Sequence, residues 1–286
     1  MHEVKWRSAT NRMFFTLDCL SMVFKITFLG TGTSTGIPLI GCTCRVCNSS
    51  NTKDKRLRSS VLVEVFKENE APAGILIDAG PDFRQQMLTY GITSLDGILL
   101  THEHRDHIAG LDDVRAFNFL SQKPVSVYAE QRVLNAVQKE FEYAFTGFHF
   151  PGLPRMVLHS INLDPFSING IRIIPVRAMH GFLPILGFRT GPFGYLTDVK
   201  DIEEKELDKF RGVEVFVVST VQKTPHRTHL SLSQAVDIAK RVGASRTYLT
   251  HLSHCLDPHK ELVGILPEGI LPAYDGLVIE LPFTDI

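Results

Sequence analysis

A stretch of seven residues, Thr101–His107, carries three imidazoles and the carboxylate of Asp106, which could bind metal ions. It reads Thr-His-Glu-His-Arg-Asp-His and directly follows the apolar run Gly97–Leu100, which is typical of a buried strand. Imidazoles and carboxylates are the ligands that hold Zn, Mn or Fe in hydrolytic sites. Four such groups packed beside a core would be costly without a metal to satisfy them. The stretch therefore predicts a metal site at the end of a strand.

Three further candidate ligands, His180, Asp198 and His251, each come after another apolar, strand-like run. Taken alone, a histidine in such a place is more often structural, and an aspartate is commonly a turn or cap residue. Together with the residues at 102–107, however, they are enough for two metal ions that share one carboxylate. We therefore expect strand ends from both halves of the chain to meet at one dinuclear site.

Three of the five cysteines form a second cluster, Cys42-x-Cys44-x-x-Cys47. Without an export signal, such a cluster favours a metal site over disulfide bridges. A closed structural zinc needs four ligands, so one must come from elsewhere. His254 is the best candidate, because one turn beyond the last site histidine could send it to this zinc, and Cys255 is its competitor. Three reduced thiols without a metal are the remaining interpretation.

Hydrophobic patterning predicts many strands with intervening helices. Strands are predicted at 24–30, 60–66, 74–80, 97–101, 125–128, 171–176, 194–197, 214–219 and 247–250. Helices are predicted at 83–90, from 108 onwards, at 130–141, and between a capping box at Ser231–Gln234 and Gly243. The glycine-rich stretch 30–36 lacks the Gly-Lys-Ser/Thr ending of a nucleotide loop and favours a tight turn near the active site. This pattern suits two sheets flanked by helices in one domain.

The composition is that of an ordinary globular protein, with 286 residues, 44% hydrophobic residues and a net charge of −1. No window offers the roughly 18 apolar residues of a membrane span, and no signal peptide is evident, so we expect a cytoplasmic protein without a membrane partner. Residues 1–21 are expected to form a poorly ordered extension, and residues 22–286 a single domain. The aromatic segment 141–154 is predicted to cover the core, to wall the site or to form a dimer surface.

The motif at 102–107 resembles the signature of the metallo-β-lactamase fold superfamily, and the other candidates follow in that family's order. The resemblance covers nearly everything from Lys25 to Leu281. It implies an α+β fold, the four-layer αββα sandwich, with the metals at one edge of the two sheets. The ligand sets that it implies are His102, His104 and His180 for one ion, Asp106, His107 and His251 for the other, and Asp198 as the bridge. Asp78 is expected to support the site by hydrogen bonding.

Within that superfamily, the cysteine loop at 41–48 is similar to that of the PhnP-type phosphodiesterases, accessory proteins of carbon–phosphorus lyase. That family has Gly-Cys-x-Cys-x-x-Cys after a Gly-Thr-Gly loop, and paired histidines such as His251 and His254. It hydrolyses phosphodiesters, including cyclic ribose phosphates and 2′,3′-cyclic nucleotides, with manganese or zinc. The resemblance implies that His229, in preference to His226, acts as general acid or holds the phosphate, and it favours a homodimer.

The sequence thus predicts a hydrolase of small phosphodiesters in which a hydroxide held between two Zn or Mn ions attacks phosphorus, with Asp106 and His229 as catalytic residues and a third, structural zinc. A hydrolase of a thioester, lactone or lactam is one alternative. A non-catalytic carrier similar to PqqB, a pyrroloquinoline quinone biosynthesis protein, is another, although the complete metal motif favours a hydrolase. No stable nucleic-acid complex is expected, because the chain has no basic excess and no obvious transfer-RNA-clamping arm.

Overall fold

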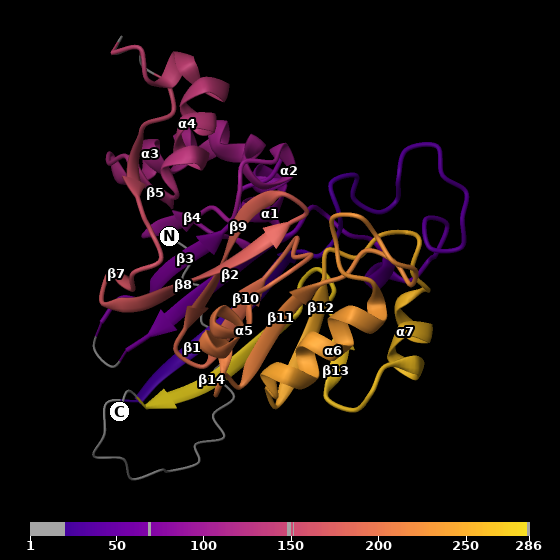
Figure 1. Cartoon of the computed structure of the whole chain (residues 1–286). Helices are drawn as coiled ribbons and strands as arrows, with labels where there is room; N and C mark the ends of the chain where they lie inside the picture. The colour runs from indigo at the N-terminus through magenta and orange to yellow at the C-terminus, as the bar shows by residue number, and fades with distance from the viewer. Residues whose placement is uncertain (1–20, 68–69, 148–149, 151, 285–286) are drawn as a thin grey trace, which may run out of the picture.

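The computed structural model describes residues 21–67, 70–147, 150 and 152–284. Within these ranges, two seven-stranded sheets pack face to face, and helices cover the outer face of each (Figure 1). The predicted four-layer αββα sandwich is therefore confirmed. None of the helices in this part of the chain is long and apolar enough to cross a membrane.

The first sheet has the strand order β14-β1-β2-β3-β4-β5-β6. Its strands are β1 (Ser21–Gly30), β2 (Ser60–Phe66), β3 (Ala73–Ile77), β4 (Gly97–Leu99), β5 (Val125–Ala129), β6 (Met156–Ser160) and β14 (Val278–Thr284). The second sheet has the order β13-β12-β11-β10-β9-β8-β7. Its strands are β7 (Phe166–Ile168), β8 (Ile171–His180), β9 (Leu183–Thr190), β10 (Phe193–Leu196), β11 (Val215–Ser219), β12 (Arg246–Thr250) and β13 (Ile270–Pro272).

The α-helices are α1 (Phe83–Tyr90), α2 (Arg105–Ile108), α3 (Arg115–Ser121), α4 (Gln131–Glu140), α5 (Glu204–Leu207), α6 (Leu232–Val242) and α7 (His259–Ile265). Short 3-10 helices lie at Thr52–Asp54, Ala109–Val114, Glu142–Ala144 and Asp208–Phe210. Two predicted helix ends are confirmed by their caps. Gly91 ends α1 in the left-handed conformation, and Ser231 and Gln234 form the capping box of α6.

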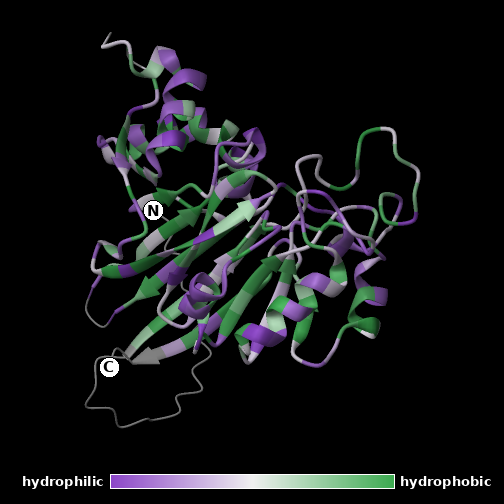
Figure 2. Cartoon of the chain, in the orientation of Figure 1, coloured by the Kyte–Doolittle hydropathy of each residue, from purple (hydrophilic) through white to green (hydrophobic). Residues whose placement is uncertain are grey.

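The alternation of side chains along the strands creates the layers. On β2, Val61 and Val63 point into the core between the two sheets, whereas Leu62 packs under the helices that cover the first sheet. On β11, Val217 faces the same central core, and Phe216 packs beneath the helices of the second sheet. Figure 2 shows the result, with apolar strands inside and helices that are apolar on one side only.

The structure corrects several boundaries of the sequence prediction. Strand β1 already begins at Ser21, which pairs with Thr284, so the expected extension is at least one residue shorter. The rest of that extension, residues 1–20, lies outside the described residues. Strand β8 runs on to His180 rather than ending at residue 176, and the helix expected from residue 108 begins as a 3-10 turn. Strands β6, β7, β9, β13 and β14 were not predicted.

The aromatic segment 141–154 is only partly described, because residues 148, 149 and 151 are outside the described ranges. Phe141 is buried in the core beneath α3 and α4, as a core-covering segment requires. Tyr143 and Phe150, in contrast, are 42% and 70% exposed. The described part of the segment therefore combines a buried anchor with surface aromatics.

Candidate metal centre

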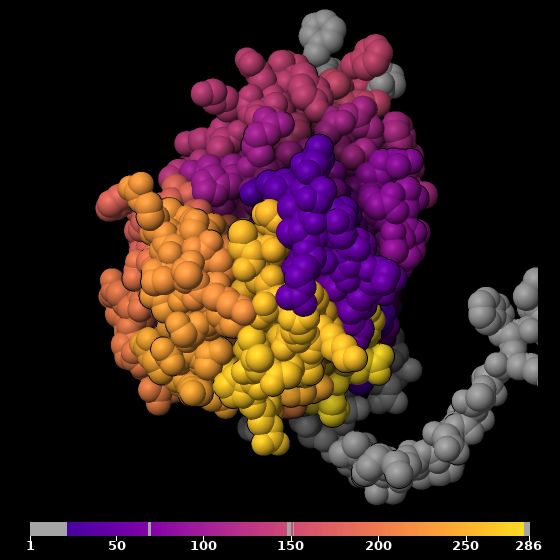
Figure 3. Space-filling model, turned by 90° about the vertical axis from the view of Figure 1, so that its right-hand side faces the viewer, coloured from indigo at the N-terminus to yellow at the C-terminus, as the bar shows by residue number. Residues whose placement is uncertain are grey.

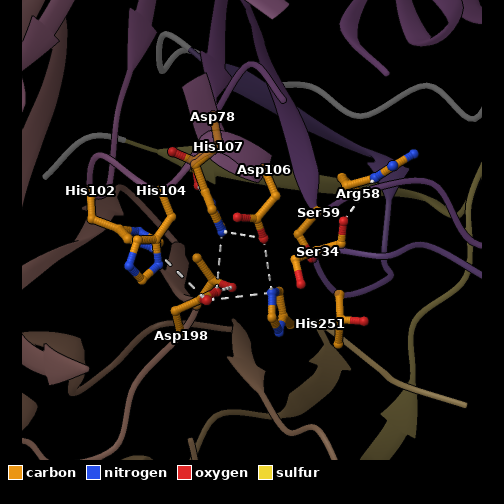
Figure 4. Close-up of polar contacts among 12 residues, drawn as sticks. Ser34, Arg58, Ser59, Asp78, His102, His104, Asp106, His107, Asp198 and His251 are labelled. Carbon is orange, nitrogen blue, oxygen red and sulfur yellow. Dashed lines mark hydrogen bonds and ion pairs between the residues drawn. The ribbon is translucent and has the colours of Figure 1, made fainter. Parts of the chain in front are cut away.

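The predicted ligands meet at one edge of the sandwich because parallel strands bring their carboxyl ends together. Strands β3 and β4 are parallel neighbours in the first sheet, and β10, β11 and β12 are parallel neighbours in the second. Asp78 follows β3, the histidine-rich stretch 101–107 follows β4, and His251 follows β12. Figure 4 shows these side chains converging from both sheets onto Asp198, which follows β10.

Three of these residues adopt left-handed backbone conformations at the strand ends. The φ angles are 63° for Asp78, 58° for Asp198 and 53° for His251. Such angles cost free energy in residues other than glycine, and they occur preferentially at functional sites. The chain therefore turns sharply at the end of each strand, at the places where the three side chains enter the site.

Four side chains place their ligating atoms at the corners of one small polyhedron. His107 Nε2 lies 3.3 Å from Asp106 Oδ2 and 3.5 Å from Asp198 Oδ1, and His251 Nε2 lies 3.7 Å and 3.4 Å from Asp106 Oδ2 and Asp198 Oδ2. A tetrahedral ion with bonds of about 2.1 Å separates its ligand atoms by about 3.4 Å. Both Nε2 atoms are buried without a hydrogen-bond partner in the described structure, so this group fits a divalent metal ion.

A second group lies on the other side of Asp198. His102 Nε2 is 3.0 Å from His104 Nδ1 and 4.0 Å from Asp198 Oδ2, so both imidazoles face one point. The ring centroids of His102 and His104 lie 5.7 Å and 5.1 Å from that of His180. Nδ1 of His180 donates a hydrogen bond to the Thr228 carbonyl (2.7 Å), which leaves its Nε2 free to bind an ion. The chain thus brings together all seven predicted ligands of the dinuclear site.

Asp78 connects both groups by hydrogen bonds and is itself completely buried. Its carboxylate accepts bonds from His107 Nδ1 (2.7 Å), the Thr101 backbone N–H (2.8 Å) and the Thr101 hydroxyl (2.9 Å). The same hydroxyl oxygen lies 2.9 Å from His102 Nδ1 and can accept a hydrogen bond from its N–H. Asp78 therefore holds His107 directly, and His102 through Thr101, in the tautomer whose Nε2 is free for a metal.

The electrostatics of the site favour a bound cation. Burial disfavours a charged His107, yet the carboxylates of Asp78, Asp198 and Asp106 raise the pKa of His107 well above its ordinary value. Burial also opposes ionisation of Asp198, but His251 and His107 hold the pKa of that carboxyl well below its usual range. Asp198 is therefore ionised at neutral pH, and a proton on His107 partly balances its charge. A metal ion would replace this proton.

His229 faces the site, and His226 lies farther out. The His229 ring is 4.4 Å from that of His180 and 5.2 Å from that of His251, whereas His226 is a half-buried neighbour 5.1 Å from His229. Burial lowers the pKa of His229 to about 3, against the opposing pull of Asp198. His229 is therefore a neutral imidazole, and its buried Nδ1 has no partner in the described structure.

The sequence did not suggest that His229 could be a metal ligand. Its ring nitrogen groups with ligating atoms of His180 and Asp198, all within 4.8 Å of one another. Because the residue stands in a loop without a metal-binding spacing, only the folded chain reveals this grouping.

The cysteine loop forms a separate group with His254. The Nδ1 atom of His254 lies 3.2 Å from Cys42 Sγ and 3.6 Å from Cys44 Sγ, close to the roughly 3.6 Å between sulfur and nitrogen ligands of a tetrahedral zinc. Cys47 completes this group, and all three thiols are free. Cys255 is exposed and lies outside it. Hydrogen bonding from the Cys47 backbone N–H lowers the pKa of Cys44 to about 6, which favours the thiolate that zinc needs.

Residues that the sequence did not single out fix the two groups relative to each other. Arg56 is buried and donates hydrogen bonds to the Thr31 hydroxyl (2.7 Å) and the Ala273 carbonyl (2.6 Å). The Leu252 N–H donates to the Thr31 carbonyl (2.8 Å), so the glycine-rich loop is tied to the segment between His251 and His254. Figure 3 shows the resulting contact of the cysteine loop region (indigo) with the C-terminal part of the chain (yellow).

Gly80 permits the close approach that brings the first ligand stretch to Asp78. A Cβ atom on Gly80 would lie 2.0 Å from the Asp106 carbonyl oxygen, which real side chains do not tolerate. The backbone N–H of Ala79 also donates to the His107 carbonyl (2.8 Å). The short segment after β3 is therefore packed directly against α2.

Comparison with known proteins agrees with this geometry. The sequence profile of the beta-lactamase superfamily domain matches residues 74–252. A crystal structure of a new diphosphatase from the PhnP family is 38% identical, covers 92% of this chain and 99% of its own, and superposes with a TM-score of 0.84. The chain belongs to the PhnP family of the metallo-β-lactamase superfamily. The predicted family is thus confirmed.

Two other relatives are more distant in sequence or differ in length. A protein of Porphyromonas gingivalis named octanoyltransferase is 42% identical to this PhnP-family chain over 251 residues, which is 87% of the chain but 50% of that relative. The chain therefore spans about half the length of this curated relative. Zn²⁺-bound PqqB from Methylobacterium extorquens is 17% identical, with a TM-score of 0.71, and covers 90% of this chain and 100% of its own. That likeness shows the shared fold alone.

Proposed function

We propose that this protein is a metal-dependent phosphodiesterase that cleaves small phosphodiesters, with cyclic ribose phosphates and 2′,3′-cyclic nucleotides as candidate substrates. One observation carries the proposal: two sets of buried ligating atoms share Asp198, at spacings that fit divalent ions, and His229 stands beside them. The similarity to a diphosphatase of the PhnP family supports phosphorus chemistry at this site.

The residues present would hold two ions, Zn or Mn, at the active site. The first would be held by His102, His104 and His180, the second by Asp106, His107 and His251, and Asp198 would contact both. When bound, such a pair supplies Lewis acidity and activates water for attack on phosphorus at neutral pH. Asp106 Oδ2 lies 3.3 Å from His107 Nε2 and 3.7 Å from His251 Nε2, where it would share an ion with both. Cys42, Cys44, Cys47 and His254 would hold a third, structural zinc.

His229 supplies the polar contact that a phosphoryl group needs. As a neutral imidazole it can donate one hydrogen bond to a phosphoryl oxygen or to the departing alkoxide. The rings of His180 and His251 on either side restrict its orientation. His229 therefore serves either to stabilise charge or to deliver a proton when the ester bond breaks.

Ester hydrolysis of another class is the second candidate, and the name of the Porphyromonas gingivalis relative favours an acyl substrate. The match covers only 50% of that relative, so the octanoyl reaction named for the whole relative is not evidence for the same reaction in this chain. A carrier role similar to that of PqqB is a third alternative, and it predicts binding without turnover.

A substrate screen separates these functions. The purified protein, stripped with a chelator and reloaded with Mn, Zn or neither, is assayed on bis(p-nitrophenyl) phosphate, on 2′,3′-cyclic AMP and on an octanoyl thioester. We expect metal-dependent hydrolysis of the phosphodiesters at a kcat/KM well above that of the thioester. A higher kcat/KM on the thioester would assign the site to acyl chemistry, and no turnover with both metals bound would favour a carrier.

A further inference from the structure

The turn between β8 and β9 exposes a phenylalanine at the edge of the candidate metal centre. His180, the last residue of β8, pairs in register with Leu183, so the turn consists of Gly181 and Phe182 alone. Gly181 has a φ of 62°, as two-residue hairpin turns require at their first position. Phe182 is 100% exposed. In a turn this short, the Phe182 side chain cannot reach the core.

This turn is held in place against the loop that carries His229. The His180 side chain donates to the Thr228 carbonyl, and a Cβ atom on Gly181 would lie only 3.0 Å from Thr228 Cγ2. Phe182 therefore stands two residues from His180 in the chain, beside the loop that places His229 in the site. The backbone of the turn is positioned by the contacts of His180 and Gly181 with Thr228.

The neighbouring loop is held by side-chain contacts and carries Arg227, a cationic side chain without an ion-pair partner among the described residues. The Gln222 side chain donates to the Thr224 hydroxyl (3.0 Å), and Lys223 pairs with Asp257. Arg227 is exposed and, within the described residues, pairs with no carboxylate. Gly181 approaches Thr228, so the exposed Phe182 and the exposed Arg227 each adjoin the point where the two loops touch. Proteins hold a base with an aromatic ring and the negative charge of a nucleotide with a guanidinium.

We propose that Phe182 is a specificity-determining residue that stacks on a planar aromatic base of the substrate, while Arg227 attracts its negative charge. The inference rests on the proposed phosphodiesterase function and narrows its substrates to phosphodiesters that carry a nucleobase. Single exposed apolar residues are common on protein surfaces and need no ligand. Phe119 on α3, 60% exposed, is such a residue and provides the matched control.

The test compares two substrates that differ only in the base. These are 2′,3′-cyclic AMP and the 2′,3′-cyclic phosphate of methyl riboside, assayed with the metal-loaded full chain. Phe182→Ala should lower kcat/KM on cyclic AMP by about tenfold or more, the size of one base–aromatic stack, and leave the base-free substrate unchanged. Phe182→Trp should retain the preference for the base, and Phe119→Ala should change neither rate. Arg227→Ala should lower kcat/KM on both substrates by the same factor.

A binding measurement distinguishes failure of this inference from failure of the proposed function. Calorimetric titration with AMP and with ribose 5-phosphate needs no turnover. We expect Phe182→Ala to raise the Kd of AMP by about tenfold and to leave the Kd of ribose 5-phosphate unchanged. If the protein hydrolyses no phosphodiester but shows this selective loss, the proposed function fails and the stacking role stands. Equal affinity of wild type and Phe182→Ala for AMP, or an equal loss for both ligands, would overturn the stacking role.

Discussion

Replacing Asp78 by asparagine should separate metal binding from folding more sharply than any ligand substitution. The carboxylate accepts bonds from His107 Nδ1 and from both polar groups of Thr101, and the Thr101 hydroxyl in turn contacts His102. Asparagine has nearly the same volume and tolerates the left-handed backbone of this position. Its amide NH₂, however, must face either His107 or the Thr101 N–H, so that donor meets donor.

The magnitude follows from how many ligands depend on this carboxylate. Partners that orient a metal-bound histidine typically contribute 10–100-fold in metal affinity, or about 1.4–2.8 kcal/mol. Because Asp78 orients a histidine of each ion set, we expect Asp78→Asn to weaken binding at both positions, by about 100-fold for the ion held through His107. At saturating metal, much of the hydrolytic activity should return, since no ligand has been removed.

The assay is competition with a chromophoric chelator for Mn or Zn, combined with activity as a function of free metal. Asp164→Asn, an exposed carboxylate between β6 and β7, is the control and should bind metal like the wild type. Thermal melts of the metal-free proteins show whether Asp78→Asn is folded under the assay conditions. Wild-type metal affinity in a folded Asp78→Asn protein would refute the orienting role of this hydrogen-bond network.

Four further changes test other parts of the site. His104→Ala should abolish phosphodiesterase activity in a protein that remains folded by circular dichroism, and full activity would contradict a metal-based reaction. His229→Gln should lower kcat by about 100-fold with unchanged metal content; a parallel loss of bound metal would instead make His229 a ligand. Cys44→Ser should release zinc from the cysteine loop and lower the melting temperature, and unchanged values of both would exclude a structural zinc there. Burial lowers the pKa of His259 to about 4. Between about pH 6.5 and 4, this histidine is therefore protonated in the unfolded chain but neutral in the folded chain. This contribution to stability should therefore be present above about pH 6.5 and be lost as the pH falls, by up to about 2 kcal/mol at pH 5, and His259→Asn should remove this part of the pH dependence in urea unfolding.

Much of this protein follows from local sequence patterns. The cluster at 102–107 signals metal binding by itself, because imidazoles and carboxylates so close to an apolar run need a common partner. The capping box at Ser231 and the glycine that ends α1 report local backbone geometry, which the residues concerned determine directly. The family resemblance then supplied the ligand order and the fold, and the arrangement of the two sheets agrees with it.

Other features depend on which atoms meet across the two sheets, and the periodicity of hydrophobic residues carries no information about these contacts. Edge strands such as β14 owe their place to pairing with strands far away in the chain. The turn after β12 places His254 rather than Cys255 with the three cysteines, and the packing of its loop against β8 places His229 next to His180. The exposure of Phe182 also appears only when β8 and β9 pair in register. The sequence by itself thus determined the chemistry available at the strand ends, and the tertiary structure decided which of these side chains lie close together, because sheet register and loop packing set distances that residue spacing leaves open.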